Sequence, residues 1–373
     1  MSENSNSILD RVMDSHKSQE KEQFYPSELV STLLKYLSGK EEDIIRRRFG
    51  LNKPQSETLE EIGASYKVTR ERIRQIENNS INKILALKNF NDQITPVEHI
   101  ISSLLAENGG FMNEKILLEN LVGYSDDKEI DERAVLFIIK VLLKGKYKYL
   151  DNQVFRSGWG LRHTSSDLAE KIINELVNIV ENSNQPLSAD TIIEKFKKTN
   201  IYSEEQQNLS DDAIISYLNL SRKIGVNPYQ EYGLANWGSI EPKRINDKIY
   251  LVLKKKNEPM HFGEIANEIN RIGFDKRKAY PPTIHNELIM NDQYVLVGRG
   301  IYALKEWGYK PGVVSEVIQE ILRKEGKALS RQELVKKVLE KRIVKKNTIH
   351  LALTDRNKFQ KTGDGNYSLV AGK

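Results

Sequence analysis

Apolar residues recur at helical spacing along most of the chain, and polar breaks divide these helices into groups. In the first quarter of the chain, two stretches have the form of a capping box, Ser38-Gly-Lys-Glu41 and Thr58-Leu-Glu-Glu61. In a capping box the hydroxyl accepts the third helical amide and the Glu reaches back to the cap, so each stretch predicts the start of a helix. We expect a compact helical unit at residues 25–92. The polar residues 1–24 before it, rich in Ser, Asn, Lys and Glu, predict a flexible arm.

Beyond Thr95 the pattern repeats with a period of about 70 residues. Each unit opens with an apolar helix, passes through a polar break into two further helices, and closes on short strands, which is the order of a winged helix. The opening helices are expected at residues 97–105, 168–180, 245–253 and 313–322. We predict winged-helix domains at residues 95–163, 166–240, 242–309 and 310–370, the second of them irregular because Asn227-Pro228 resists a plain strand.

Short alternating segments predict the wings of the first and third units. Residues 147–150 are expected to pair with 154–155, and residues 294–297 with 301–304 across Gly298-Arg-Gly300. A tryptophan recurs at the same place in three units, as Trp159, Trp237 and Trp307. This recurrence favours packing of the wing against the body over stacking on nucleic-acid bases. The fold class is therefore mainly α with small β wings: a helix-turn-helix followed by about four tandem winged-helix domains.

The second helix of the predicted helix-turn-helix carries the candidate chemistry. Gly63 lies where the first helix must let the second approach, and Thr69 is placed to cap the second helix. At about 100° per residue the apolar side holds Ile73, Ile76 and Ile84. The opposite face holds Glu71, Arg74, Gln75 and Asn78, flanked by Arg70 and Arg72.

Side chains of these types recognise base edges in the major groove. Arg binds guanine O6 and N7, Gln pairs with adenine, and Glu accepts from cytosine N4. A carboxylate among cations weakens a surface that only holds phosphates, so Glu71 favours base reading. The alternative is that Glu71 stabilises the positive end of the helix and that Arg70 and Arg74 form a solvated stripe.

The segment that starts at Ser38 resembles region 4 of the sigma-70 family of RNA polymerase initiation factors, in the stretches RRRFGL, TLEEIG and VTRERIRQIE. The resemblance implies that the helices before the turn meet the flap of RNA polymerase. It also implies contacts with the minus-35 promoter element by Arg70, Glu71, Arg74 and Gln75. Positions near the DNA backbone are implied for Arg48, Thr58, Leu59, Thr69 and Arg72.

This resemblance covers about 60 of the 373 residues, and the chain departs from the family pattern elsewhere. The residues before Pro26 are too few for the region 2 that melts the minus-10 element, so we expect a protein other than a complete initiation factor. After the reading face, family members often carry basic residues that meet activators. This chain has Asn78, Asn79, Ser80 and Asn82 there, which argues against activator contact.

The third repeat, at residues 242–309, resembles a HARE-type winged helix in INDKIYLVLKKKNEPMHFGEIANEI and VLVGRGIYALKEWGY. This module is shared by the RNA polymerase delta subunit and some chromatin and restriction proteins, and it implies binding to nucleic acid or polymerase. Arg299 would lie at the wing tip. The possible DNA contacts of this unit are Lys254, Lys255, Lys256, Arg277, Lys278 and Arg299. The alternative for each is a solubility charge at a helix end or turn.

Composition narrows the remaining classes of function. The net charge is +5, which suits an anionic partner, and there is no cysteine, so disulfides, thiolate zinc sites and cysteine nucleophiles are excluded. The six histidines have no metal-ligand spacing, and Gly298-Arg-Gly300 lacks the helix that a nucleotide-binding loop requires. We expect no enzyme activity, metal, cofactor or small-molecule substrate. No signal peptide or membrane span is evident, and we expect a cytoplasmic, nucleoid-associated protein.

Three functions remain open at this point. The first is a regulator that reads a minus-35-like element in double-stranded DNA and contacts RNA polymerase. The second is a delta-like or partial-sigma protein that binds RNA polymerase mainly through protein contacts. The third is the DNA-targeting subunit of a restriction or defence system.

Overall fold

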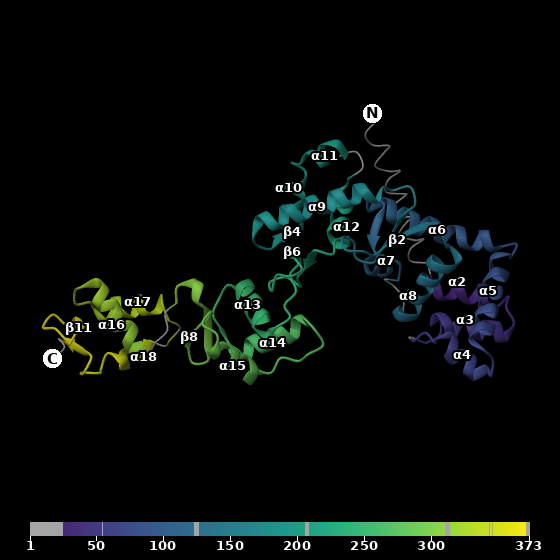
Figure 1. The fold of residues 1–373 in the computed structure, drawn as a ribbon. Coiled ribbons are helices and arrows are strands. Elements are labelled where there is room, and N and C mark those ends of the chain that lie inside the picture. The colour runs from purple at the N-terminus through teal and green to yellow at the C-terminus, as the bar shows by residue number, and fades with distance from the viewer. Residues whose placement is uncertain are drawn as a thin grey trace, which may run out of the picture. The chain divides into compact units, whose positions relative to one another are not determined.

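The computed structural model of the chain describes residues 25–53, 55–122, 127–205, 209–309, 314–342, 344 and 346–370. The predicted arm at residues 1–24 lies outside the described residues. Contacts divide the chain into two compact units, Met1–Gly225 and Val226–Lys373. Helices predominate in both, with small antiparallel sheets beside them, which confirms the predicted fold class (Figure 1).

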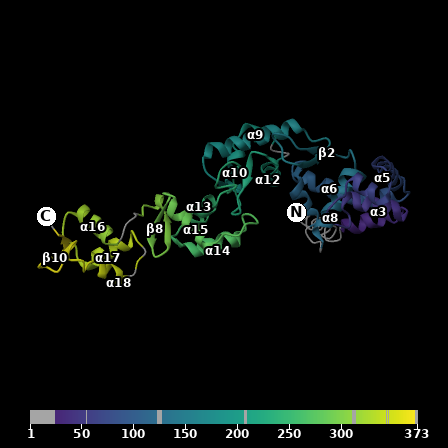
Figure 2. The ribbon, with the colours of Figure 1, turned by 60° about the horizontal axis from the view of Figure 1, so that its bottom comes forward.

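Unit 1 begins with the predicted helix-turn-helix. Its helices are α2 (Pro26–Leu34), α3 (Gly39–Phe49), α4 (Leu59–Tyr66) and α5 (Arg70–Leu85). Both capping boxes form: Glu41 accepts the amide of Ser38 at 3.0 Å, and Glu61 accepts that of Thr58 at 2.7 Å. Helices α3 and α5 lie side by side in both views (Figures 1 and 2). The small core between α3, α4 and α5 consists of fully buried Ile44, Ile62 and Ile73.

Helix α6 (Phe90–Glu107) runs without interruption through the residues where we predicted a domain boundary, 92–95. Its buried side chains Ile94, Val97 and Ile101 belong to a core that also contains Leu33 of α2 and Phe137. Residues 25–92 and 95–163 therefore share one apolar core. The predicted boundaries of all the domains remain predictions.

The rest of unit 1 combines further helices with short strands. The helices are α7 (Glu114–Leu121), α8 (Lys128–Phe137), the π-helical turn η1 (Ile138–Leu142), α9 (Ser166–Ser183), α10 (Ala189–Phe196), α11 (Asn200–Glu205) and α12 (Asp211–Leu220). The strands are β1 (Phe111–Asn113), β2 (Tyr147–Leu150), β3 (Gly158–Leu161), β4 (Leu187–Ser188) and β5 (Ile224–Val226), which reaches the boundary of the unit. Strand β3 lies between β1 and β2 in a three-stranded antiparallel sheet.

The predicted partner of residues 147–150 is wrong. Strand β2 pairs with β3, with Tyr149 opposite Trp159, whereas the buried Phe155 bridges to Ser221. Glycine makes this pairing possible: a Cβ on Gly160 would lie 2.0 Å from the Phe111 ring. The glycines that weaken the strand signal of 158–161 are thus what lets this strand occupy the middle of the sheet.

Unit 2 contains two successive groups of three helices followed by strands. Strand β6 (Glu231–Leu234) precedes both groups. The first group comprises α13 (Ile245–Lys256), β7 (Met260–His261), α14 (Phe262–Ile272), α15 (Pro281–Met290), β8 (Tyr294–Gly298), β9 (Ile301–Leu304) and η2 (Lys305–Trp307), and its sheet has the order β7-β9-β8. The second comprises α16 (Val314–Glu325), α17 (Arg331–Leu339), α18 (Lys346–Ala352), β10 (Phe359–Lys361) and β11 (Tyr367–Leu369). Residue 313, the expected start of α16, lies outside the described residues.

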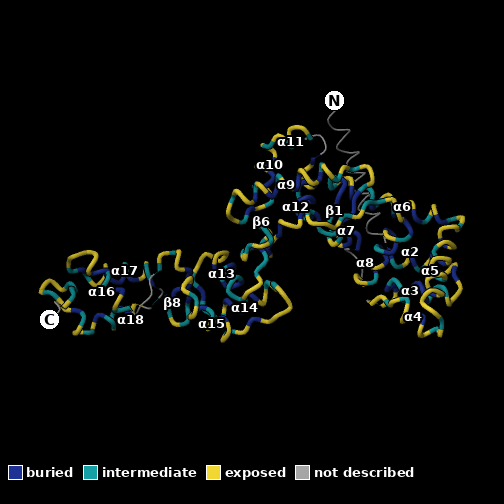
Figure 3. Tube along the Cα trace, in the orientation of Figure 1, coloured by how far each residue is buried: buried dark blue, intermediate teal, exposed yellow. Residues whose placement is uncertain are grey.

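The pairing of β8 with β9 confirms the hairpin predicted for residues 294–304. Each group has its own apolar core, one around Ile249, Ile265 and Ile284 and one around Ile318 and Leu334. The buried positions follow the helices of both groups in Figure 3. This order of elements is the one expected for winged helices, and the assignment to that family remains a prediction.

Candidate nucleic-acid interface

The turn between α4 and α5 requires glycine at one position. A Cβ on Gly63 would lie 2.8 Å from the carbonyl oxygen of Val68, closer than real Cβ contacts. Lys67 ends α4 in the left-handed region at φ 55°, and the Val68 amide donates to the Gly63 carbonyl at 3.0 Å. Thr69 then caps α5, since its Oγ1 accepts the Arg72 amide at 3.3 Å. The local sequence therefore sets the angle at which α5 leaves α4.

The predicted base-reading side chains all lie on the exposed side of α5, away from buried Ile73. The exposed residues are Arg70, Glu71, Arg72, Arg74 and Gln75. Two of them form a bidentate ion pair: Arg74 donates from Nε and Nη2 to Glu71 at 2.9 and 2.7 Å. The Arg74 guanidinium lowers the pKa of Glu71, which keeps this carboxylate charged. Because both side chains are about half exposed, at 53% and 55%, exchanging this pairing for contacts to bases costs little.

The residues predicted near the DNA backbone fall into two groups. Thr58 and Thr69 are exposed at the starts of α4 and α5, where the positive end of each helix dipole favours phosphate oxygens. Arg72 is also exposed and donates to Gln75 at 3.2 Å, while Leu59 packs on the small core. Arg48 is held inward, because its Nη1 donates to the Glu57 carbonyl at 3.3 Å and its Nε lies 3.4 Å from Glu77.

Arg47 has a structural role that the sequence reasoning missed. Its guanidinium binds Glu57 with two hydrogen bonds, at 3.0 and 2.5 Å, and donates to Ser65 Oγ at 2.9 Å. The Glu57 carboxylate raises the pKa of Arg47, and the pKa of Glu57 is lowered in return. Arg47 therefore ties α3 to the loop before α4 and to α4 itself. The sequence signal was present in RRR, but its spacing does not show which arginine joins α3 to α4.

In unit 2, three of the lysines predicted to contact DNA are neutralised by carboxylates. Lys254 pairs with Glu306 at 2.6 Å, Lys256 pairs with Glu268 at 3.0 Å, and Lys255 pairs with Glu231. The remaining candidates are exposed: Arg277 and Lys278 in the loop before α15, and Arg299 in the turn between β8 and β9. Cations compensated by carboxylates attract phosphates weakly, so the loop and the turn are the better candidates in this unit.

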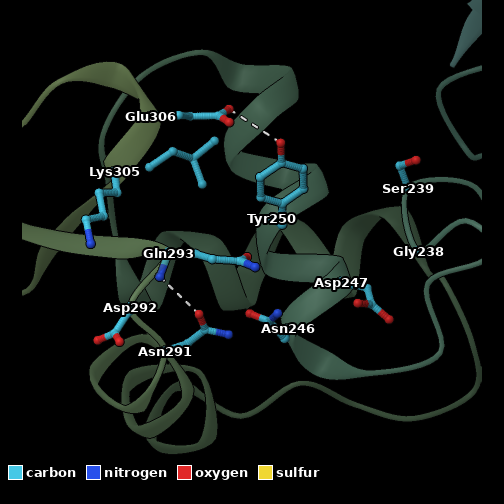
Figure 4. Close-up of a pocket in the computed structure, with 11 residues that line it drawn as sticks. Gly238, Ser239, Asn246, Asp247, Tyr250, Asn291, Asp292, Gln293, Lys305 and Glu306 are labelled. Atoms are coloured by element: carbon cyan, nitrogen blue, oxygen red, sulfur yellow. Dashed lines mark hydrogen bonds between the residues drawn. The ribbon is translucent and has the colours of Figure 1, made fainter. Parts of the chain in front are cut away.

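A pocket of about 760 Å³ in unit 2 has the wrong charge for nucleic acid (Figure 4). Its walls include the carboxylates of Asp247, Asp292 and Glu306, and Tyr250 donates to Glu306 at 3.4 Å. Lys305 is also in the lining and Glu306 pairs with Lys254, but Asp247 and Asp292 add carboxylates that repel phosphate oxygens. The pocket therefore does not extend the nucleic-acid surface.

Comparison with known proteins identifies the family of the helix-turn-helix region. Residues 33–84 match the family model Sigma-70, region 4. The chain carries a sigma-70 region 4 domain. It is 46% identical over 57 residues to RNA polymerase sigma factor SigA of Lactococcus lactis subsp. cremoris, which covers 15% of this chain and 16% of that protein. The identity is the same, over 15% of each chain, for SigA of Lactococcus lactis subsp. lactis and of Clostridium acetobutylicum.

The chain thus spans about one sixth of the length of these relatives. The region 4 domain begins within α2 and ends within α5, so it contains every residue predicted to read bases. The HARE-type resemblance of residues 242–309 stays a prediction. Over the described part of the chain, no helix has the length and apolar character needed to cross a membrane.

Proposed function

We propose that this protein is a transcription regulator that reads a minus-35-like element through α5 and associates with RNA polymerase. A sigma-70 region 4 domain is a non-catalytic DNA-binding module and indicates a promoter-binding role in transcription. The specific element, the residues that read it and the contribution of the other helices are our inference.

One observation carries this proposal. On a helix fixed by the Gly63 turn and the Thr69 cap, the exposed side presents Arg74, Gln75 and Glu71 together. These side chains supply both donors and an acceptor, which is what distinguishing base pairs in the major groove requires. Side chains near the N-terminal end of such a helix are the ones that reach base edges.

A gel-shift series tests the proposal. We expect Arg74→Ala and Gln75→Ala each to weaken binding to the preferred duplex by about 5- to 150-fold and to relax base choice at one position. Lys88→Ala, a change at an exposed position beyond the end of α5, serves as the matched control. Equal losses on all duplexes would show that α5 binds phosphates without reading bases.

A second function is favoured by the paired lysines of unit 2. Since Lys254, Lys255 and Lys256 are compensated by carboxylates, unit 2 suits a protein partner better than a phosphate backbone. The protein would then bind RNA polymerase chiefly through protein contacts. Phosphate-driven binding falls steeply as salt rises, whereas a protein interface loses much less, so a salt titration of polymerase capture separates the two functions.

A further inference from the structure

The region 4 helices of this chain already have a partner inside the same unit. Helix α2 packs against α8, which follows it by about 100 residues, and the end of α5 contacts η1. The amide of Ser27 at the start of α2 donates to Asp131 Oδ1 at 2.8 Å. Asp131 is 4% exposed, so this hydrogen bond lies inside the contact.

Apolar packing continues the contact from α2 to α3. The ring of Phe49 at the end of α3 lies 4.8 Å from the ring of Phe137 at the end of α8, measured between centroids. Phe137 is 2% exposed, and it shares one core with Leu33, Leu34 and Ile84. An amphipathic helix thus covers α2 and the end of α3, while the predicted reading residues of α5 stay exposed.

Without α8, the apolar side chains of α2 and of the turn after it would form an open face. Val30, Leu33, Leu34 and Leu37 line α2 and the turn after it, and each is at most 8% exposed. Such a row of side chains on two helices is the form of a groove that accepts an amphipathic helix. In this structure α8, followed by η1, occupies the face and is itself such a helix.

We propose that α8 and η1 act as a built-in competitor for this face, so that RNA polymerase reaches α2 and α3 only when α8 is displaced. The proposal rests on the polymerase association in the proposed function and leaves DNA reading by α5 unaffected, because Arg70, Glu71, Arg74 and Gln75 stay exposed while α8 packs on α2. The chain would bind promoter DNA with the polymerase-facing side of its region 4 closed.

A crosslink in the full chain tests this competition. The chain has no cysteine, so Ser27→Cys with Asp131→Cys gives one defined thiol pair, which oxidation or a short thiol crosslinker closes. The probe is RNA polymerase core enzyme, captured in a pull-down, with duplex binding measured in parallel. Asp131→Ala is the loosened variant, and Phe137→Ala is a second, stronger one. Circular dichroism checks that each variant is folded.

The proposal predicts that loosening raises polymerase capture by about fivefold or more over the unaltered chain, and that crosslinking returns it to the unaltered level or below. The duplex affinity of every variant stays within about twofold of that of the unaltered chain, as expected when the DNA-reading residues of α5 are distant from the changed residues. Crosslinked protein that captures polymerase as well as the loosened variants would overturn the proposal. Absence of capture by every folded variant would overturn it too, while leaving promoter reading, which the duplex measurement tests, intact.

Discussion

Helices α5 and α15 are each the third helix of a small apolar core, built by α3 to α5 and by α13 to α15, yet they present different surfaces. The exposed side of α5 carries charged and amide groups, including Arg70, Arg74 and Gln75. The exposed side of α15 carries Thr283, Asn286, Ile289 and Met290, with the last two 62% and 85% exposed. A helix with donors and acceptors suits base edges, and an apolar one suits a protein. The comparison teaches that a similar order of helices along the chain does not give similar exposed surfaces.

The largest effect is expected from opening the core beneath either helix. Ile73 under α5 and Ile284 under α15 are both fully buried, so Ile73→Ala and Ile284→Ala should each cost about 2–5 kcal/mol of unfolding free energy. Urea unfolding measures this, and duplex binding is measured beside it. Only Ile73→Ala should impair duplex binding. If Ile284→Ala lost duplex binding and Ile73→Ala did not, unit 2 and not α5 would be the part that recognises DNA.

A smaller effect, on base choice, should distinguish the two helix surfaces. Glu71→Gln removes the acceptor charge and frees Arg74, so preference at one base pair should fall by roughly tenfold. Asn286→Ala on α15 is the matched change and should leave base preference unaltered. Selection from a random duplex library reports both. A shift caused by Asn286→Ala and not by Glu71→Gln would reverse the roles of the helices.

Two sets of cations in unit 2 should differ in their effect on DNA binding: the lysines held in ion pairs and the exposed cations of the loop before α15. Arg277→Ala with Lys278→Ala removes two exposed cations and should lower the slope of log binding constant against log salt concentration by about 1 to 2. Lys254→Ala with Lys256→Ala should change it little, because both lysines are paired with Glu306 and Glu268. Binding measured from low to moderate salt gives the slopes. A larger change from the lysine pair would mean that these ion pairs open when DNA binds.

The smallest effect concerns acid stability, where the two units resemble each other. A hydrogen bond from Lys83, with others from Ser38, lowers the pKa of Glu41 to about 2, and Arg271 with Lys256 does the same for Glu268. Each carboxylate therefore stabilises the fold fully above pH 4.5, its ordinary pKa, and loses that contribution as the pH falls towards 2. Glu41→Gln and Glu268→Gln should each lower the free energy of unfolding by about 0.5 kcal/mol at neutral pH. Each variant should also lose less stability than the unaltered chain as the pH falls. Urea midpoints between pH 2 and 6 measure it, and an unchanged acid slope in either variant would show that its ion pair adds nothing.

The sequence predicted the helix-turn-helix well because its determinants are local. The capping boxes at Ser38 and Thr58, the close approach at Gly63 and the cap at Thr69 each act within a few residues. Helical spacing then placed Ile73 inside and its neighbours outside. The roles of the exposed residues in DNA binding remain predictions.

What the sequence did not predict depends on distant partners. The packing of α2 on α8 joins Ser27 to Asp131, and helical periodicity shows that a face is apolar without showing what covers it. The pairing of Lys254 with Glu306 joins residues 52 apart, so the triple lysine looked like a free basic patch. The pairing of 147–150 with 158–161 was missed because glycine lowers strand propensity, although a close approach required glycine there.

The central claim, that α5 reads bases, is tested most directly by sequencing the duplexes retained by the full chain from a random library, with Glu71→Gln plus Gln75→Ala in parallel. The account predicts a short enriched motif for the unaltered chain, similar to a minus-35 element, and the loss of that enrichment in the double variant with phosphate-driven binding retained. Uniform coverage by the unaltered chain, or the same motif in both proteins, would contradict it.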